Sequence, residues 1–578
     1  MTREWLENRT ASDINLSLEF IPKAKDRAAW EGIPQNIKDE KIKEAEGYLS
    51  FSFEGLTATD FLLFKREGNR GVYENKSLKK RDALSALVIG ECLEYKGRFT
   101  DAIINGIWSL CEESFWGVPA HNDGKALPDV NEPIIDIFAA QTAGTVTLAA
   151  YVLADELNAV SPQITQRVQY EVEKRILTPF AESTSFWWMG YYRKDINNWN
   201  PWILSNIIYP ILIYKKFELV DKALYVLDAF LNYCSDEGSC DEGMTYWNVG
   251  ALCMFEFLET LYRSSGGTID FYGNAKVRNC LAFVLKMYIG GGQFVNFADA
   301  APLTPINFAT VYRVGTRLGN DEIKALAAEL YANRSEKNKS EYLALKRDIF
   351  DLFAYADLLR TQPLNAKSAY YYMSDIQVLT FKSKKHFVAI KGGSNGENHN
   401  HNDVGSFIFY SDEKPVIIDI GAPFYDARSF SDRRYEIFSN QSAYHNLPIV
   451  NGSQQQAGGE HRAEEFSAKK YCVSMKLDSC YGEKCSRTFD YRNEHLYITD
   501  TFDNAEVHTC FICAAEPQQT DGGVKVNGTK ILCSAPHKLK AEKIVLDDLR
   551  LKNSWGDVIW RVIFSFENAN KTEFEIGE

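Results

Sequence analysis

The chain has 578 residues, of which 45% are hydrophobic and 13% aromatic, and its formal net charge is -14. This length exceeds what one hydrophobic core usually supports, so we expect more than one folded domain. The negative charge argues against nonspecific nucleic-acid binding, and no run of eighteen apolar residues predicts a membrane-spanning helix.

The first residues lack the apolar core of a signal peptide. As written, the sequence therefore predicts a cytoplasmic protein, or a periplasmic or secreted one if a signal has been removed.

Residues 35 to 360 show apolar side chains at the three-and-four spacing of helices, with Gly, Asn and Pro in the connections. Many similar helices in succession favour stacked antiparallel hairpins, as a solenoid or a closed toroid. Because no fixed-period repeat is evident, we predict an (α/α) toroid over residues 1–360. The clearest helices are expected at residues 81–95, 99–113, 134–157, 163–178, 200–217, 220–234, 247–262 and 275–288.

Two polar and aromatic clusters stand out in this helical half. At 196–202, Asn200 is expected as an N-cap with Pro201 at the first helical position. Capping leaves Asn197 and Asn198 unexplained, and amides beside aromatic rings are typical of a saccharide cleft, although core packing explains any single aromatic equally well. Further on, Tyr246 is either a buried tyrosine with one hydrogen bond or a proton donor.

Near residue 365 the pattern changes to short β-branched and aromatic runs separated by turn residues. This pattern predicts an antiparallel β-sandwich over residues 361–578, after a linker at 351–367. The whole chain is thus a multidomain α+β protein. The expected strands are residues 374–382, 386–391, 406–410, 415–420, 471–477, 496–502, 531–534 and 558–566.

Two of the nine histidines, His399 and His401, lie one residue apart among small polar residues. In an extended segment both would point to the same face, where one could move protons and the other bind a metal. Asp419 lies within an apolar strand, and His445 follows downstream. His401, Asp419 and His445 are ligands of the type that zinc prefers, since a buried carboxylate needs a partner.

With these residues in place, the chain resembles the heparinase II/III-like polysaccharide lyases over nearly its whole length. The resemblance implies the toroid, the sandwich and a cleft between them for uronic-acid-containing glycans. The matching segments are Pro119-Ala120-His121, Asn197-Asn198-Trp199-Asn200, Glu242-Gly243 through Tyr246-Trp247, Asn398 through Asp403, Ile418-Asp419-Ile420-Gly421, and Arg434-Tyr435-Glu436 through Pro448.

The family's chemistry is β-elimination, which leaves a 4,5-unsaturated uronate. The resemblance implies that Asn198 neutralises the substrate carboxylate. It implies that Tyr246 is the acid, and the base as well for one uronate epimer, while His399 is the base for the other epimer or stabilises the carboxylate. Some relatives have a histidine where this chain has Trp199, so it stays open whether Asn197 or Asn198 faces the carboxylate.

The resemblance also names substrate-binding and metal residues. His121, Asn197, Trp199 and Arg434 would contact the glycan, Arg434 through its guanidinium. His401, Asp419 and His445 would hold a structural zinc, or another divalent ion, which fixes the loop that presents His399. His399 should then face the substrate and His401 the sandwich, so the segment must twist or bulge.

The expected partner is an anionic polysaccharide or oligosaccharide, such as heparan sulfate, chondroitin sulfate or hyaluronan, with no nucleic acid and no membrane. An oligoalginate lyase of the same architecture is an alternative. A glycoside hydrolase is another, with Asp136, Asp241 and Glu242 as its only candidate carboxylates. A noncatalytic glycan-binding protein is a third. A homodimer is one option for the assembly.

Overall fold

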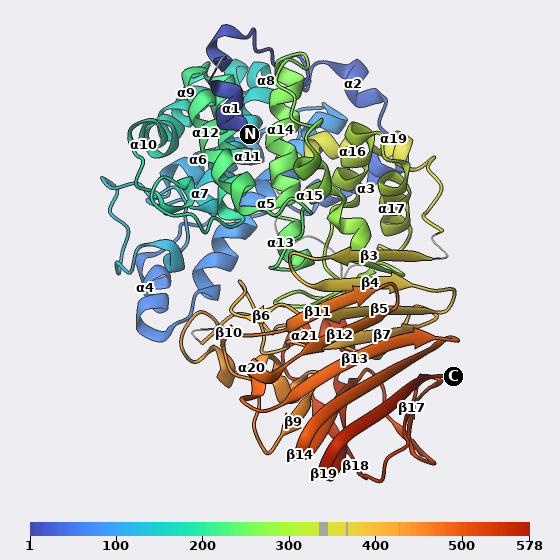
Figure 1. Ribbon diagram of the computed structural model, residues 1–578. Coiled ribbons are helices and arrows are strands. Elements are labelled where there is room, and N and C mark those ends of the chain that lie inside the picture. The colour runs from blue at the N-terminus through green and yellow to red at the C-terminus, as the bar shows by residue number, and fades with distance from the viewer. Residues whose placement is uncertain (8, 335–344, 366–367, 427) are drawn as a thin grey trace.

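The computed structural model describes residues 1–7, 9–334, 345–365, 368–426 and 428–578. It has a helical N-terminal region and a C-terminal region of antiparallel β-structure (Figure 1). This confirms the predicted α+β organisation at the coarse level, while the closed toroid and the sandwich stay predictions. The described α-helices before residue 360 are α1 (Thr2–Leu6), α2 (Arg27–Glu31), α3 (Gln35–Glu46), α4 (Ala58–Glu67), α5 (Gly71–Glu94), α6 (Thr100–Glu112), α7 (Ile137–Val152), α8 (Ala154–Val160), α9 (Pro162–Val172), α10 (Thr178–Glu182), α11 (Trp199–Ile213), α12 (Glu218–Tyr233), α13 (Met244–Trp247), α14 (Ala251–Ser264), α15 (Ala275–Lys286), α16 (Phe308–Leu318), α17 (Asp321–Ala332), α18 (Leu345–Leu352) and α19 (Tyr355–Leu358).

The helix predicted at 134–157 is two helices, α7 and α8, which meet at Leu153. The side chain of Asp136 caps α7 by accepting a hydrogen bond from the Ala139 N–H.

Within the described residues no single helix is long and apolar enough to cross a membrane. Helices α7 and α8 meet that test only as a pair, and the pair is bent by 80°.

The start of α11 differs from the prediction. Asn200 is not the N-cap, because the helix begins at Trp199 and Asn198 precedes it. The Asn200 amide is instead buried inside the helix bundle, where it donates to the backbone carbonyls of Trp188 and Val226.

The predicted linker between the two regions starts too early, because Asp351 is buried in α18. Residue 367, its predicted end, lies outside the described residues.

The pairings of the C-terminal strands are antiparallel, and the longest pair is β14 with β19. A small hairpin of β1 (Tyr288–Gly290) and β2 (Gln293–Phe294) lies within the helical region. The C-terminal region also has helices α20 (Asp478–Tyr481) and α21 (Leu549–Trp555). Its described strands are β3 (Ala369–Met373), β4 (Val378–Lys382), β5 (His386–Lys391), β6 (Ser394–Asn395), β7 (Phe407–Ser411), β8 (Lys414–Ile417), β9 (Pro448–Val450), β10 (Gly458–Arg462), β11 (Glu464–Lys469), β12 (Cys472–Lys476), β13 (Cys485–Arg492), β14 (His495–Cys513), β15 (Gln518–Thr520), β16 (Gly523–Val526), β17 (Thr529–Cys533), β18 (Lys538–Val545) and β19 (Val558–Gly577).

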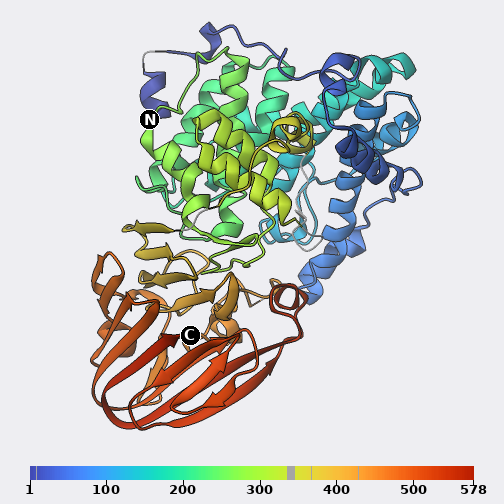
Figure 2. The ribbon, with the colours of Figure 1, turned by 90° about the vertical axis from the view of Figure 1, so that its right-hand side faces the viewer.

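Strands β3, β4, β5 and β7 lie between the helices and the long strands β13, β14 and β19 (Figures 1 and 2). Side chains alternate between the two sides of a strand. Accordingly, Phe387 and Ala389 of β5 belong to the helical core, whereas Val388 and Ile390 belong to the core of the β-region. Both faces of this layer are therefore buried, and the two regions share a continuous apolar interface.

Candidate active site and metal centre

The loop 396–405 joins β6 to β7 and is not extended. His399 has a φ of +53°, in the left-handed region that few residues other than glycine adopt. Strict alternation of His399 and His401 is thus broken by a turn. The expected twist is present. Apart from one carboxylate that they share, the two imidazoles have different neighbours, Tyr246 for His399 and His445 for His401.

Both imidazoles meet one carboxylate that the sequence did not reveal, Asp299 in the loop between β2 and α16. Asp299 is completely buried. Its Oδ2 lies 2.9 Å from Nδ1 of His399, and its Oδ1 lies 3.1 Å from Nε2 of His401. Arg434 donates to the same Oδ1 at 2.8 Å. Burial works to raise the pKa of Asp299, but these three partners outweigh it and hold the pKa well below its usual range.

Tyr246 lies on α13, and its ring stacks on that of His399 with 4.1 Å between centroids. Its hydroxyl is 2.5 Å from the hydroxyl of Tyr425, which donates in turn to Asp299. Because the Tyr425 proton goes to the carboxylate, Tyr246 is the donor to Tyr425. Burial, followed by the nearby Tyr425, raises the pKa of Tyr246 well above its usual value, so the phenol keeps its proton.

Asn198 reaches the same place from the start of α11. Its Nδ2 donates to Oε2 of Glu242 at 3.2 Å, and that oxygen lies 3.8 Å from Nε2 of His399. The three predicted catalytic residues, Asn198, Tyr246 and His399, are therefore brought together from two helices and one loop. Their neighbour Asn197 accepts a hydrogen bond from the Trp199 N–H and so supports the helix start.

His121 and Trp199 form an aromatic group beside this cluster, with 4.5 Å between ring centroids. Trp199 also contacts Trp187 at 5.0 Å. Nδ1 of His121 is held by Asp136 at 2.8 Å. Asp136 uses its other oxygen as the cap of α7, so both of its oxygens are occupied. Glycan contact by His121, Asn197 and Trp199 stays a prediction.

Arg434 makes a different set of contacts from the one expected of a substrate ligand. Besides Asp299, its guanidinium donates to the backbone carbonyls of Asn400 and Ser429. Its side chain is only 12% exposed. Arg434 therefore anchors the loop 396–405 to Asp299, and its contact with a glycan anion stays a prediction.

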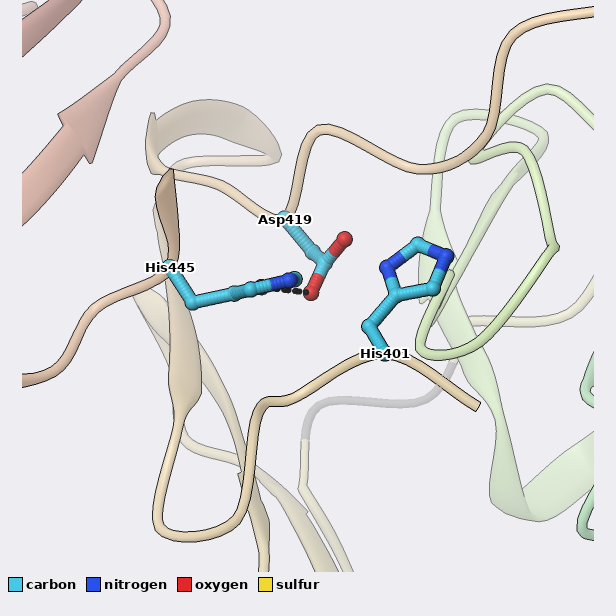
Figure 3. A group of neighbouring side chains, drawn as sticks. All are labelled: His401, Asp419 and His445. Carbon is cyan, nitrogen blue, oxygen red and sulfur yellow. Dashed lines mark hydrogen bonds and ion pairs between the residues drawn. The ribbon is translucent and has the colours of Figure 1, made fainter. Parts of the chain in front are cut away.

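His401, Asp419 and His445 converge in the interior (Figure 3), with ligand atoms within 4.8 Å of one another. Nδ1 of His445 is 3.1 Å from Oδ2 of Asp419. Nδ1 of His401 and Nε2 of His445 are buried and have no hydrogen-bond partner among the described residues. Unpaired buried nitrogens are costly, and two imidazoles with a carboxylate are a zinc donor set. The residues fit a metal, with Asp299 orienting His401 from its far side.

A cavity of about 440 Å³ opens beside the cluster, between the two regions. Asn198, Glu242 and Tyr246 line it from the helical region. Glu397 and Arg462 line it from the β-region. The site thus has space for a sugar unit at the interface of the two regions.

Residues 364–512 match the family described as heparinase II/III-like, C-terminal. This segment is therefore similar to a heparinase II/III-like C-terminal domain. It contains the histidine loop and all three metal-site residues, which confirms the resemblance predicted from those segments. The predicted catalytic residues Asn198 and Tyr246 lie outside the matched segment, in the helical region.

Solved structures share the fold over most of the chain. A heparan sulfate lyase from Pedobacter heparinus is 10% identical, with a TM-score of 0.57, and the match covers 98% of this chain and 93% of that one. A chondroitin AC lyase from Streptomyces coelicolor is 8% identical, with a TM-score of 0.55 and coverage of 93% and 78%. A Paenibacillus xanthan lyase is 10% identical, with a TM-score of 0.58 and coverage of 93% and 56%. No curated protein matches.

Proposed function

We propose that this protein is a polysaccharide lyase that cleaves uronic-acid-containing glycans by β-elimination. The observation that carries the proposal is the convergence of Asn198, Tyr246 and His399, with the phenol protonated and with Asn198 and Tyr246 lining one cavity. An amide, an acid and a base are the three groups that elimination from a uronate requires.

The Asp299 carboxylate orients the base. In the tautomer that this role requires, His399 donates from Nδ1 to Asp299 and keeps the lone pair of Nε2 for the substrate. In the reaction Nε2 takes the proton from carbon 5 of the uronate, while the Asn198 amide stabilises the charge on the carboxylate. The electrons of the C5–H bond form the C4–C5 double bond as the C4–O bond breaks. Tyr246 then gives its proton to the leaving oxygen, and for the other epimer Tyr246 would serve as base as well.

We further propose that His401, Asp419 and His445 hold a structural zinc ion. When bound, the metal would fix the position of His401 and, through the short loop, that of His399. Because Asp299 contacts both imidazoles, the metal centre and the base share one anchoring carboxylate.

The substrate is an anionic polysaccharide or oligosaccharide, and glycosaminoglycans such as heparan sulfate, chondroitin sulfate or hyaluronan are the first candidates, with alginate as the alternative. The solved structures of similar fold are described as acting on different glycans. A glycoside hydrolase is less well supported, because Asp136 is occupied by His121 and by the α7 cap.

A panel of uronate glycans, followed by ultraviolet absorbance of the unsaturated product, tests the proposal. We expect absorbance to rise with at least one glycan, and Tyr246→Phe and His399→Ala to lower the rate roughly 10²-fold or more. Tyr170→Phe and His508→Ala, at sites away from the cleft, are the matched controls. Full activity of both cleft variants contradicts the residue roles, and new reducing ends without absorbance would indicate hydrolysis.

A further inference from the structure

Glu242 lies between the two groups that would handle the uronate. It is 4% exposed, its Oε2 accepts from Asn198 at 3.2 Å, and the same oxygen is 3.8 Å from Nε2 of His399. Its Oε1 has no protein partner among the described residues, and the side chain lines the cavity. Neither proton removal by His399 nor proton delivery by Tyr246 involves Glu242.

The surroundings of Glu242 favour its neutral form. Burial, then the charges of Asp241 and Asp299, raise the pKa of Glu242 to about 8, and the Asn198 amide offsets this only in part. Nearby Arg434 is paired with Asp299. The other titratable groups that face Glu242 are Cys240 beside it, Tyr233 on α12, Tyr246 on α13 and His399.

An ionised Glu242 would oppose substrate binding. The cavity wall already contains the carboxylates of Asp241, Asp375 and Glu397, against one guanidinium, that of Arg462. A uronate brought to His399 and Asn198 would then meet a further negative charge within a few ångströms. A protonated carboxyl removes that repulsion and adds an O–H donor at the same point.

We propose that Glu242 donates a hydrogen bond from its carboxyl O–H to the substrate carboxylate, next to the Asn198 amide. This inference rests on the lyase function proposed above. Removal of the C5 proton increases the negative charge on that carboxylate, so a donor placed there stabilises the transition state more than the ground state. Glu242 keeps its proton below about pH 8 and loses it above, so the reaction slows as pH rises through that value.

Isosteric and truncating variants separate this role from others. Glu242→Gln keeps a donor and carries no charge, so we expect kcat/KM within about threefold of wild type at pH 7, without the wild-type fall between pH 8 and 10. Glu242→Ala has no donor, and we expect a loss of roughly 10²-fold. The same isosteric change at Asp299, which is ionised, should instead abolish most activity. Far-ultraviolet circular dichroism checks that each variant is folded.

The proposal is overturned if Glu242→Gln is as inactive as Glu242→Ala, or if it keeps the wild-type alkaline fall. A substrate-free measurement separates this failure from failure of the lyase function. In infrared difference spectra between pH 6 and 10, we expect wild type to lose a protonated-carboxyl band that Glu242→Gln lacks. If the band is present and no glycan is cleaved, the lyase function is wrong, whereas an ionised Glu242 at pH 6 overturns the inference itself.

Discussion

Asp299 is the residue that holds the two histidines, Tyr425 and Arg434 in one arrangement. Asp299→Asn keeps the shape but removes the charge that fixes the Nδ1 proton on His399. We expect kcat to fall roughly 10²-fold while KM changes little, because the proposed uronate contacts remain. Steady-state kinetics on the cleaved glycan measure this split.

Asp521→Asn, at an exposed carboxylate in the turn before β16, is the matched control for that change. An equal loss in the control would point to a general effect of charge. A rise in KM with unchanged kcat would show that Asp299 serves substrate binding and does not orient the base.

The sequence predicted the site residues that stand out as polar side chains beside aromatic or apolar segments. Asn198, Tyr246 and His399 are brought together as the resemblance implied, although their catalytic roles stay predictions. Asp299 was missed because a single carboxylate in an irregular loop has no spacing that sets it apart. Only its position among the small and apolar residues 296–301 could have drawn notice.

Helices α14 and α18 are joined by a buried ion triad, in which Glu256 pairs with Lys346 and Arg347, each at 2.7 Å. Glu256→Gln leaves two buried cations without a counter-charge, so we expect the free energy of unfolding to fall by about 3–5 kcal/mol. Chemical denaturation at pH 7 measures this. Glu436→Gln, which breaks an exposed pair with Arg433, should have no measurable effect.

The triad also makes the free energy of unfolding depend on pH in the acid range. Burial would raise the pKa of Glu256, but Arg347 and Lys346 lower it to about 2. The folded pKa is thus below the unfolded value of about 4.3, so this contribution is present above pH 4.3 and is lost as pH falls through 2. Acid unfolding of wild type should be steeper in this window than that of Glu256→Gln, and parallel curves would contradict the assignment.

The spacing of apolar residues predicted where most helices and strands lie, but it did not predict their lengths. The predicted strands at 496–502 and 558–566 are parts of β14 and β19, which run on to Cys513 and Gly577. Both strands contain polar stretches, such as residues 503–506, whose composition predicts a turn. Their pairing with each other, a contact distant in sequence, keeps these stretches in the sheet.

For the whole molecule, removal of the proposed zinc should lower stability. A ligand that binds only the folded state stabilises it by about 4 kcal/mol at 1,000 times its Kd. We therefore expect chelation to lower the midpoint of thermal unfolding and added zinc to restore it, with about one zinc per chain by elemental analysis. His445→Ala should be insensitive to the chelator, and His508→Ala should respond as wild type does.

The shared layer of β3, β4, β5 and β7 predicts that the two regions unfold together. Separating them would expose Met373, Phe387 and Tyr410, which are buried against the helical core. Scanning calorimetry should show one endotherm whose calorimetric and van't Hoff enthalpies agree. Two well-separated endotherms would show that the interface contributes little.

That layer also decides where chimeras of this chain can be made. Strands β5 and β7, which precede and follow β6 and the loop carrying His399, have side chains in the helical core as well as in the β-core. A recombination breakpoint near residue 360, between α19 and β3, would therefore pair the helices of one parent with packing side chains of another. A breakpoint after β7 keeps that packing and the loop 396–405 from a single parent, so hybrids joined there should preserve the packing between the two regions.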